Sequence, residues 1–320
     1  MKKIRIAVAG YGNLGKAVIT NLANFTDFEL IGVFSRRNID VGFPIYAYED
    51  AQSLTNKIDA VIMCGGSALD LPQQSPYMAQ YFNIVDSFDT HAKIPQHFEN
   101  VQKAAKKANT LAAISVGWDP GIFSLQRLLF NAVLPNGTGC TFWGKGVSQG
   151  HSDAIRKIKG VKRAVQYTVP NEAAVQKFKS GKMSGISAQD LHLRECFVVA
   201  KENAEKSDIE HAIVTMPNYF AGYTTKVHFI SETEFYHTHA QLPHGGGVIH
   251  TGSTSLHARH LLEFSAKYDS NPEFTASVLL AYARAVVRLS AKGKTGCVTV
   301  FDIPYSYISK LDNESMIKLL

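Results

Sequence analysis

The feature that most constrains the fold is a glycine pattern near the N-terminus, where Gly10, Gly12 and Gly15 follow the apolar run 4–9. In a G-x-G-x-x-G turn the first glycine permits a tight turn and the second lets a pyrophosphate approach the backbone, while the third lets the next helix pack closely. A helical pattern follows, and a second apolar run covers residues 28–34. This context predicts a dinucleotide-binding strand–helix–strand unit, whose helix N-terminus attracts phosphate.

The end of the second apolar run indicates which dinucleotide is bound. Enzymes that use NAD carry an acidic residue here for the ribose diol. This chain has Ser35, Arg36 and Arg37 instead, and a hydroxyl with two guanidinium groups suits a 2′-phosphate. The alternative is a solvated basic turn after an unrelated strand. We expect NADP(H) as the cofactor. The expected cofactor-binding residues are Gly10, Tyr11, Gly12, Asn13, Leu14, Gly15, Ser35, Arg36, Arg37, Cys64, Gly65, Ser67, Ser87 and Phe88.

Strands and helices alternate through the first third of the chain. Helices of ten or so residues between short apolar strands imply right-handed crossovers. The predicted fold class is therefore α/β, with a Rossmann-type, doubly wound parallel sheet. Beyond the first two strands, the expected elements are strands at 59–64, 83–86 and 111–116 and helices at about 71–81 and 98–108.

After Gly117 the pattern changes. Residues from about 139 to 254 are rich in β-branched and aromatic side chains, with alternation at 226–230. This predicts a second α+β domain, a mixed sheet with two or three short helices, for substrate binding and dimerisation. The alanine-rich helical pattern at 274–290 is expected to return to the first lobe. The expected domains are a discontinuous dinucleotide-binding lobe, 1–117 plus about 272–320, and a substrate-binding and dimerisation domain at about 118–271.

Composition excludes several classes of protein. At 320 residues the chain is too long for one small core. The net charge of +6 is modest, without a block of like charges, so a nucleic-acid partner is not expected. The four cysteines form no C-x-x-C, which suits a reducing compartment. Lys2 and Lys3 precede an apolar run too short for a signal peptide, and no segment approaches the roughly eighteen apolar residues of a membrane span. We expect a cytoplasmic protein without a membrane partner.

Ten segments in order give the chain a specific resemblance. Along nearly its whole length it resembles the meso-diaminopimelate dehydrogenases. One departure is Gly65, which stands where family members have a bulkier residue. The matching segments are 8–15, 34–37, 85–89, 117–121, 142–144, 148–154, 166–168, 194–200, 243–246 and 271–277.

The resemblance implies a reaction. It is the reversible, NADP-dependent oxidative deamination of the D-centre of meso-2,6-diaminopimelate. The products are L-2-amino-6-oxopimelate, which cyclises to tetrahydrodipicolinate, together with ammonia and NADPH. In reverse, the reaction feeds the synthesis of lysine and peptidoglycan precursors. The resemblance also implies a homodimer whose lobes close over the substrate.

Two aspartates are the expected catalytic residues. In a doubly wound sheet, ligands lie beyond the carboxyl ends of the strands, and Asp89 and Asp119 follow two of these ends. By resemblance, both match positions near the reacting D-centre. Two carboxylates can hold its ammonium, and one whose pKa rises on desolvation can accept the ammonium proton. The alternatives are an Asx-type turn or helix cap for Asp89 and ordinary turn chemistry for Asp119.

A second group is expected at the distal L-centre. By resemblance, Thr168, Arg194, His244 and Asn271 match the positions that hold it, and its carboxylate suits a bidentate arginine. The alternatives are a strand-edge charge for Arg194, a loop residue for His244 and a helix N-cap for Asn271. Both tryptophans are expected as apolar walls or buried structural residues, and 148–150 as backbone donors. The remaining expected substrate-binding residues are Trp118, Trp143, Ser148, Gln149 and Gly150.

Other functions remain open at this point. His237, His239, His244 and His250 lie close together in sequence, but no acidic residue stands at ligand spacing, so no metal is expected. A different Rossmann NADPH reductase of amino-acid metabolism is the first alternative. A non-catalytic NADPH-binding protein is the second. An assay with diaminopimelate stereoisomers separates them.

Overall fold

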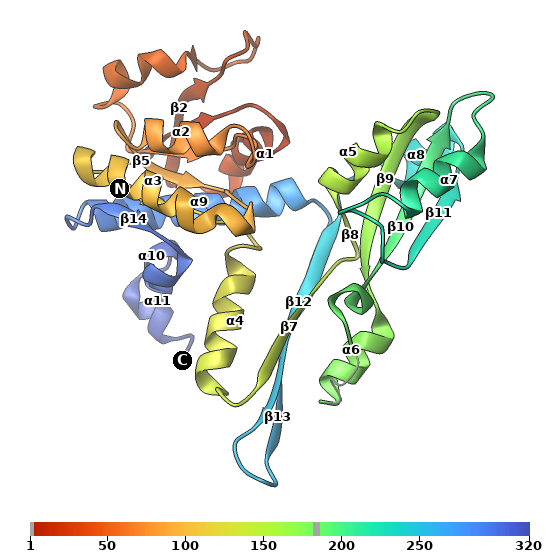
Figure 1. Ribbon diagram of the computed structural model, residues 1–320. Coiled ribbons are helices and arrows are strands. Elements are labelled where there is room, and N and C mark those ends of the chain that lie inside the picture. The colour runs from red at the N-terminus through yellow and green to blue at the C-terminus, as the bar shows by residue number, and fades with distance from the viewer. Residues whose placement is uncertain (1–2, 182–185) are drawn as a thin grey trace. The chain divides into compact units, whose positions relative to one another are not determined.

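A computed structural model describes residues 3–181 and 186–320, and the chain forms two compact units (Figure 1). The first unit contains the chain up to Leu125 together with Pro272–Leu320, and the second contains Gln126–Asn271. The division falls within helix α4 (Ile122–Val133), a few residues beyond the boundary at Gly117 drawn from the sequence. The turn at 117–121 is hydrogen-bonded to the first residues of α4, so these residues stay with the first unit.

The first unit is built on a seven-stranded sheet in the order β14-β6-β5-β4-β1-β2-β3. Every pairing in it is parallel. The chain starts at β1 and builds outward in both directions, which confirms the predicted doubly wound sheet. Its strands are β1 (Ile4–Ala9), β2 (Phe28–Phe34), β3 (Ile45–Tyr46), β4 (Ala60–Met63), β5 (Asn83–Asp86), β6 (Leu111–Ala113) and β14 (Gly296–Val298).

Helices cover both faces of this sheet, as the alternation along β1 shows. Ile6 and Val8 pack in one cluster with α1 (Asn13–Asn21) and the long helix α9 (Asn271–Ser290). Ala7 and Ala9 pack in the opposite cluster. The helices of this opposite face are α2 (Leu71–Met78) and α3 (Ile94–Ala108). Because both faces are buried, the strands read as continuous apolar runs rather than alternating ones.

Local chemistry explains where the elements differ from the sequence prediction. Helix α3 begins four residues before the expected start at 98, because Pro95 is favourable in a first turn. Strand β6 ends at Ala113 rather than Val116, because Ser115 takes a positive φ of 56° that a strand does not allow. The short strands β3 and β14 were not predicted, since two or three residues carry no periodic signal.

The second unit contains two sheets where the sequence suggested one. The predicted mixed sheet is present, in the order β11-β10-β9-β8, and a separate antiparallel sheet has the order β13-β12-β7. Four helices, rather than two or three, lie between α4 and α9 in the described residues. The elements are β7 (Thr138–Trp143), β8 (Gly146–Val147), α5 (Gln149–Arg156), β9 (Val161–Pro170), α6 (Glu172–Lys179), β10 (His192–Ala200), α7 (Lys206–Val214), β11 (Thr225–Phe229), α8 (Glu232–Thr238), β12 (His244–Ser253) and β13 (Arg259–Tyr268).

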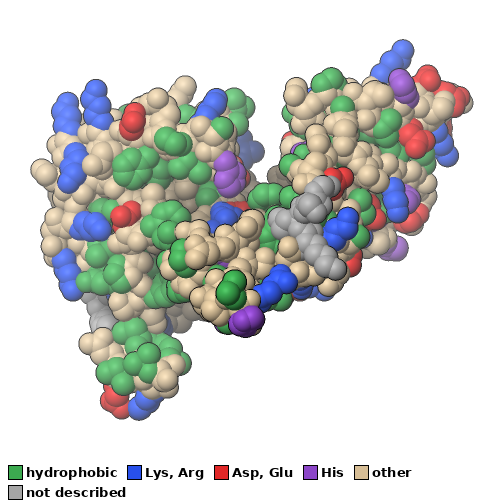
Figure 2. Space-filling view, turned by 60° about the horizontal axis from the view of Figure 1, so that its bottom comes forward, with side chains coloured by type: hydrophobic (Ala, Val, Ile, Leu, Met, Phe, Trp, Pro, Cys, Tyr) green, Lys and Arg blue, Asp and Glu red, His purple; other side chains and the backbone are tan. Residues whose placement is uncertain are grey.

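Side chains of all kinds are interspersed over the face shown in Figure 2, without a broad field of one charge. Among the residues that the structure describes, no helix combines the length and the apolar character that crossing a membrane requires.

An ion pair between a buried arginine and a partly exposed aspartate joins the two chain segments of the first unit. Arg284 of α9 is 4% exposed and donates to Asp27 through Nε (2.6 Å) and Nη2 (2.9 Å). Its Nη1 donates to the carbonyl of Ile308 at 2.6 Å. Burial opposes ionisation of Asp27, but the hydrogen bonds and charge of Arg284 outweigh it and lower the pKa of Asp27 below 3.8. The pair therefore stabilises the return of the C-terminal segment onto the first lobe.

Replacing Asp27 with Asn should lower the free energy of unfolding by about 3 kcal/mol at neutral pH, because Arg284 then stays buried without a counter-charge. The folded-state pKa of Asp27 is depressed, so this stabilisation is present above its unfolded value of 3.8 and is lost as pH falls through the folded value. Urea unfolding should therefore show the two proteins converging below about pH 4. Asp40→Asn, the same charge change at an exposed position, should have little effect. A constant difference at all pH values would contradict this account.

Candidate active site

The glycine turn after β1 lies against the loop after β4. Gly10 has a φ of +101°, and a Cβ there would lie 3.2 Å from the carbonyl carbon and oxygen of Cys64. A Cβ on Gly15 would collide with the carbonyl oxygen of Gly10, whereas open space surrounds the corresponding position of Gly12. Helix α1 starts at Asn13 without a side-chain cap. The N–H groups of its first turn are thus available to an anion at the open side of the turn.

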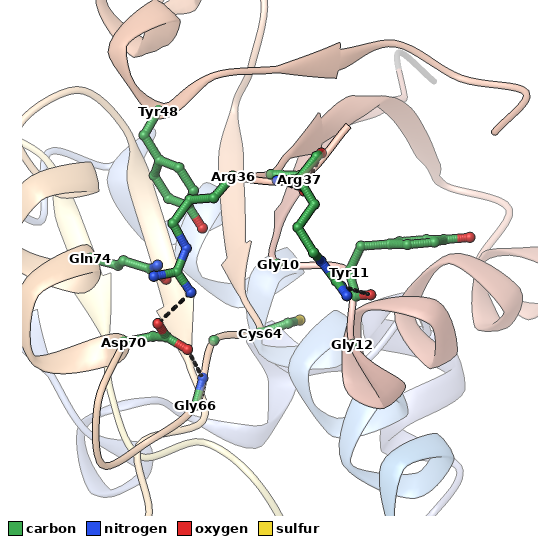
Figure 3. A pocket seen from close by; sticks show the side chains of 12 residues that line it. Gly10, Tyr11, Gly12, Arg36, Arg37, Tyr48, Cys64, Gly66, Asp70 and Gln74 are labelled. Carbon is green, nitrogen blue, oxygen red and sulfur yellow. Dashed lines mark hydrogen bonds and ion pairs between the residues drawn. The ribbon is translucent and has the colours of Figure 1, made fainter. Parts of the chain in front are cut away.

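The basic turn after β2 is held beside the glycine turn. Its shape is fixed by Ser35, whose Oγ accepts a hydrogen bond from Arg37 N (3.0 Å). Arg37 Nη2 donates to the carbonyl of Tyr11 at 3.0 Å, and Arg36 Nη2 pairs with Asp70 Oδ1 at 2.7 Å (Figure 3). The Arg36 side chain is 71% exposed, so most of its guanidinium remains accessible. The two arginines therefore present cations on two sides of one pocket.

These segments enclose a cavity of about 350 Å³ that lies wholly in the first unit (Figure 3). Eight of the residues expected at the cofactor line it, and four further residues were missed. Two of the missed residues, Asp70 and Gln74, are four apart at the start of α2, and this spacing could have indicated that they share one face of the helix. A third, Tyr48, lies in the 3-10 helix η2 (Tyr48–Leu54), which carries no motif. The lining residues are Gly10, Tyr11, Gly12, Ser35, Arg36, Arg37, Tyr48, Cys64, Gly65, Gly66, Asp70 and Gln74. The expected residues outside this lining are Asn13, Leu14, Gly15, Ser67, Ser87 and Phe88.

Two missed residues define the chemistry of the pocket wall. Asp70 accepts the N–H of Gly66 through Oδ2 at 2.9 Å while pairing with Arg36 through Oδ1. Burial raises the pKa of Tyr48 to about 12, so its hydroxyl stays protonated at neutral pH. Gly65 is confined, because a Cβ there would lie 2.7 Å from Gln74 Oε1. The pocket therefore combines backbone donors, two guanidinium groups and one carboxylate, which suits a nucleotide with an additional phosphate.

The loop that carries Asp89 is held by Ser67. The N–H groups of Asp89 and Thr90 donate to Ser67 Oγ at 2.9 and 3.1 Å. Asp89 itself is exposed. The N-cap of the following 3-10 helix is Thr90 rather than Asp89, which weighs against a capping role for Asp89. Ser67 was expected at the cofactor, and here its hydroxyl shapes the loop of the candidate catalytic aspartate.

Asp119 lies in a closed turn before α4. The N–H of Ile122 donates to the carbonyl of Gly117 at 3.0 Å, and that of Phe123 to the carbonyl of Trp118 at 2.8 Å. Gly121 has a φ of +132°, and a Cβ there would collide with Gly117 O, so the turn requires glycine. Trp118 is buried with its ring 5.2 Å from Phe123 in an edge-to-face arrangement. Its burial favours the structural alternative, and Asp119 is partly exposed.

In the second unit, neighbouring strands bring the expected distal-centre residues together. Thr168 of β9 pairs in register with Gly146 of β8 and with Arg194 of β10. Arg194 Nη1 donates to Thr168 Oγ1 at 2.9 Å. A Cβ on Gly146 would collide with the imidazole of His244, so this ring lies directly beside the same strands. The N–H of Asn271 donates to the carbonyl of residue 242 at 2.9 Å, which places it near the segment that leads into His244.

Arg194 is a buried cation, and no carboxylate among the described residues pairs with it. It is 9% exposed, and burial lowers the pKa of its guanidinium below the ordinary value. Its guanidinium lies over the ring of Tyr223, 4.3 Å from the centroid. In the residues that the structure describes, Arg194 forms no ion pair with a carboxylate and its Nε has no hydrogen-bond partner. Because an unpaired buried charge is costly, this arrangement favours an anionic ligand.

Two histidines beside Arg194 are neutral. Burial, and then the charge of Arg194, lower the pKa of His151 and of His192 to about 4. His192 Nε2 accepts a hydrogen bond from the backbone N–H of Trp143 at 2.8 Å. The imidazole of His192 also stacks on the indole of Trp143, with 5.4 Å between the ring centroids. His151 Nδ1 lies 2.7 Å from the hydroxyl of Ser148. Both rings therefore supply polar groups without repelling the guanidinium. His151, His192 and Tyr223 were missed by the sequence analysis.

The start of α5 offers backbone donors. Ser148 is its N-cap without a side-chain cap bond, and Gln149 and Gly150 form an exposed first turn. The N–H groups of Gln149 and Gly150 point out of the start of the helix, whereas that of Ser148 donates to the carbonyl of Gln166 at 2.9 Å.

The histidines that are close in sequence do not converge. His250 is buried and lies 2.9 Å from the carbonyl of Leu134, while His239 Nδ1 lies 2.9 Å from the hydroxyl of Tyr167. Among residues 3–181 and 186–320, no three His, Cys, Asp or Glu side chains gather in a group that could hold a metal ion.

Known proteins are similar to this chain along its whole length. The family model described as "Diaminopimelic acid dehydrogenase C-terminal domain" matches residues 117–270. The meso-diaminopimelate D-dehydrogenase of Ureibacillus thermosphaericus is 52% identical over 325 residues and covers 100% of both chains. That of Lysinibacillus sphaericus is 51% identical over 97% of this chain and 96% of its own.

Solved structures agree. The structure of C. glutamicum DAP dehydrogenase in complex with DAP has a TM-score of 0.91 at 42% identity, covering 99% of each chain. An engineered D-amino acid dehydrogenase bound to NADP⁺ has a TM-score of 0.85 at 40% identity, again covering 99% of each chain. Identity at this level over the full length settles the relationship: the chain belongs to the meso-diaminopimelate D-dehydrogenase family.

Proposed function

We propose that this chain is an NADP-dependent dehydrogenase that oxidatively and reversibly deaminates the D-centre of meso-2,6-diaminopimelate. The products are L-2-amino-6-oxopimelate, ammonia and NADPH, and the reverse reaction supplies lysine and peptidoglycan precursors. The observation that carries the proposal is the buried guanidinium of Arg194, which lacks a counter-charge within the described residues. A dicarboxylic amino acid supplies that charge at its non-reacting end.

The pocket of the first unit fits the cofactor. Its open glycine turn and the uncapped start of α1 suit a pyrophosphate, and Arg36 and Arg37 suit a 2′-phosphate. NADP⁺ supplies the hydride acceptor when bound. The relative that carries NADP⁺ in its structure is 40% identical over nearly the whole chain.

The residues of the second unit select and anchor the substrate. Arg194 binds the distal carboxylate, and Thr168 orients the guanidinium through its 2.9 Å hydrogen bond. His244 and Asn271 complete the shell from the adjoining segment. Because His151 and His192 are neutral at pH 7, they accept hydrogen bonds and add no charge that would compete with Arg194 for the carboxylate.

Asp89 and Asp119 act on the reacting amine. They hold the ammonium of the D-centre, and one of them takes its proton. The nitrogen lone pair is then free to form an imine as the Cα hydrogen leaves with its electron pair. Water adds to this imine and ammonia departs, which leaves the 6-oxo product. Each carboxylate is supplied by a separate loop at the carboxyl end of the sheet, after β5 and after β6.

We further propose that the protein acts in the cytoplasm as a homodimer, with the second unit binding substrate and contacting the second copy. The free thiols Cys64, Cys140, Cys196 and Cys297 support a reducing compartment. The first experiment is a spectrophotometric assay of NADPH formation with NADP⁺ and meso-, LL- or DD-diaminopimelate. Turnover of the meso isomer alone is expected. Turnover of none would favour another Rossmann reductase or a non-catalytic protein.

Cofactor choice depends on the basic turn. Replacing Arg36 and Arg37 together with Ala should raise the Michaelis constant for NADP⁺ by on the order of 100-fold, because each charge-assisted contact is worth roughly 1.5–3 kcal/mol. The constant for NAD⁺ should change far less. Steady-state kinetics with both cofactors test this. Lys16→Ala, which removes a charge beside Tyr11 but outside the basic turn, is the control. Equal losses with both cofactors would refute the assignment.

Substrate anchoring depends on Arg194. The variant Arg194→Met keeps an unbranched apolar stem but removes the guanidinium and its charge, so it should abolish most binding of meso-diaminopimelate and leave NADPH binding near wild type. Calorimetric titration with each ligand measures both. Arg163→Met on the same sheet, where Arg163 pairs with Glu232, should bind substrate normally. An unchanged substrate affinity in Arg194→Met would place this residue outside the site.

The chemical step depends on the two aspartates. Asp89→Asn and Asp119→Asn should each lower kcat by roughly 10- to 1000-fold, the range of general-base effects, with the Michaelis constant for NADP⁺ nearly unchanged. Deamination should rise with pH, because free amine is more plentiful at alkaline pH, while reductive amination should peak lower. Asp40→Asn is the matched control. If both variants keep normal kcat and only bind substrate more weakly, the aspartates position the substrate and another group is the base.

A further inference from the structure

One buried carboxylate outside the ligand sites holds the ends of two neighbouring strands. Asp86, the last residue of β5, is 0% exposed. Its Oδ1 accepts the backbone N–H groups of Phe88 (3.1 Å) and Ser115 (2.9 Å). Its Oδ2 accepts Ser75 Oγ (2.8 Å) and His97 Nε2 (2.6 Å). No lysine or arginine pairs with it in the described part of the chain, so its charge is offset by four hydrogen bonds.

The two backbone donors belong to the loops that carry the candidate catalytic residues. Phe88 directly precedes Asp89, and Ser115 opens the segment that leads through the closed turn to Asp119. A further backbone bond joins these loops, from the N–H of Val116 to the carbonyl of Asp86 at 2.9 Å. A single carboxylate oxygen therefore fixes the starts of both loops relative to each other.

The conformation of Ser115 shows that this bond is needed. Ser115 has a φ of 56°, a left-handed conformation that costs a residue with a side chain about 1 kcal/mol or more. Such a conformation persists only where the surroundings impose it. The hydrogen bond from its N–H to Asp86 holds it in this conformation, while its own hydroxyl is buried without a partner in the described residues.

His97 supports the same loop from the other side. It is 3% exposed, and its ring stacks on that of Phe88 with centroids 4.0 Å apart and planes 15° apart. The same ring donates to Asp86. Since Ser67 accepts the next two N–H groups, those of Asp89 and Thr90, the chain is held on both sides of the Asp89 side chain.

We propose that Asp86, supported by His97, is a positioning residue for the dehydrogenase reaction: it sets the places of Asp89 and Asp119 without touching the substrate. This inference rests on the proposed function, because it takes these two aspartates as the groups that act on the amine. A buried carboxylate that no lysine or arginine of the described residues neutralises is a costly way to fill a core position. Two of its four hydrogen bonds hold the two loops, and the other two fix the carboxylate against α2 and α3.

Three variants separate positioning from stability. Asp86→Ala leaves the N–H groups of Phe88 and Ser115 without their acceptor, so it should lower kcat by roughly 10- to 100-fold. Asp86→Asn retains an oxygen for both N–H groups and should recover most of this loss. Ser75→Ala removes one bond to Oδ2 but releases neither loop, so it should lower the thermal midpoint and keep kcat near wild type.

The readouts are kcat, the Michaelis constants for meso-diaminopimelate and NADP⁺, and the thermal midpoint of each variant. The expected pattern is a fall in kcat with the constant for NADP⁺ within about twofold of wild type, since the basic turn is untouched. An Asp86→Ala variant whose kcat falls no further than that of Ser75→Ala would overturn the inference. So would an Asp86→Asn variant that recovers nothing.

A fourth variant keeps the test decisive if Asp86→Ala does not fold. His97→Leu and Ser75→Ala each remove one bond to Oδ2, but only His97→Leu frees the ring of Phe88. A lower kcat in His97→Leu alone supports positioning, and equal values overturn it. Wild-type protein without turnover of meso-diaminopimelate would overturn the proposed function together with this inference. An active wild type with any of the contrary patterns would overturn only the inference.

Discussion

Parallel pairing around β1 is the constraint on which the nucleotide site and both aspartate loops depend. Because β1 pairs in parallel with β2 and β4, and β5 and β6 follow in the same direction, all their carboxyl ends meet at one edge. Gly10 then lies against the carbonyl of Cys64, and the arginines after β2 reach the same cavity. Pairing of this kind leaves the functional groups to loops while the strands supply a rigid, largely buried frame.

The structure treats its buried and partly buried charges in three different ways, and the differences separate scaffold from site. Asp27 and Arg284 neutralise each other through two hydrogen bonds, and this ion pair has only to stabilise the fold. Asp86 is satisfied by four neutral or weakly basic donors, which gives a fixed geometry around it. Arg194 is left without a carboxylate in the described residues, and the neighbouring histidines are neutral. An uncompensated buried charge is costly to the free protein and becomes favourable when a ligand carries the opposite charge.

Sequence alone predicted the parts of this structure that local patterns encode. The glycine turn, the basic turn and the alternating strands of the first lobe are continuous in sequence, so their periodicity and spacing are visible. The second sheet of the second unit was not separated from the first, because both consist of similar alternating strands. Tyr48, His151, His192 and Tyr223 were missed for a related reason. Their roles come from contacts made by distant segments, and nothing in their immediate neighbours marks them.

The two arginines of the basic turn are not equivalent, although the sequence presents them as a pair. Arg37 is held by the carbonyl of Tyr11, a neutral dipole, and keeps its full charge for a ligand. Arg36 is already paired with the carboxylate of Asp70, which also accepts a hydrogen bond from the N–H of Gly66. A phosphate that approaches Arg36 meets an existing ion pair and the repulsion of its carboxylate. Both guanidinium groups therefore attract a 2′-phosphate, Arg37 more strongly than Arg36, and the Arg36–Asp70 pair also gives the pocket its shape before the ligand arrives.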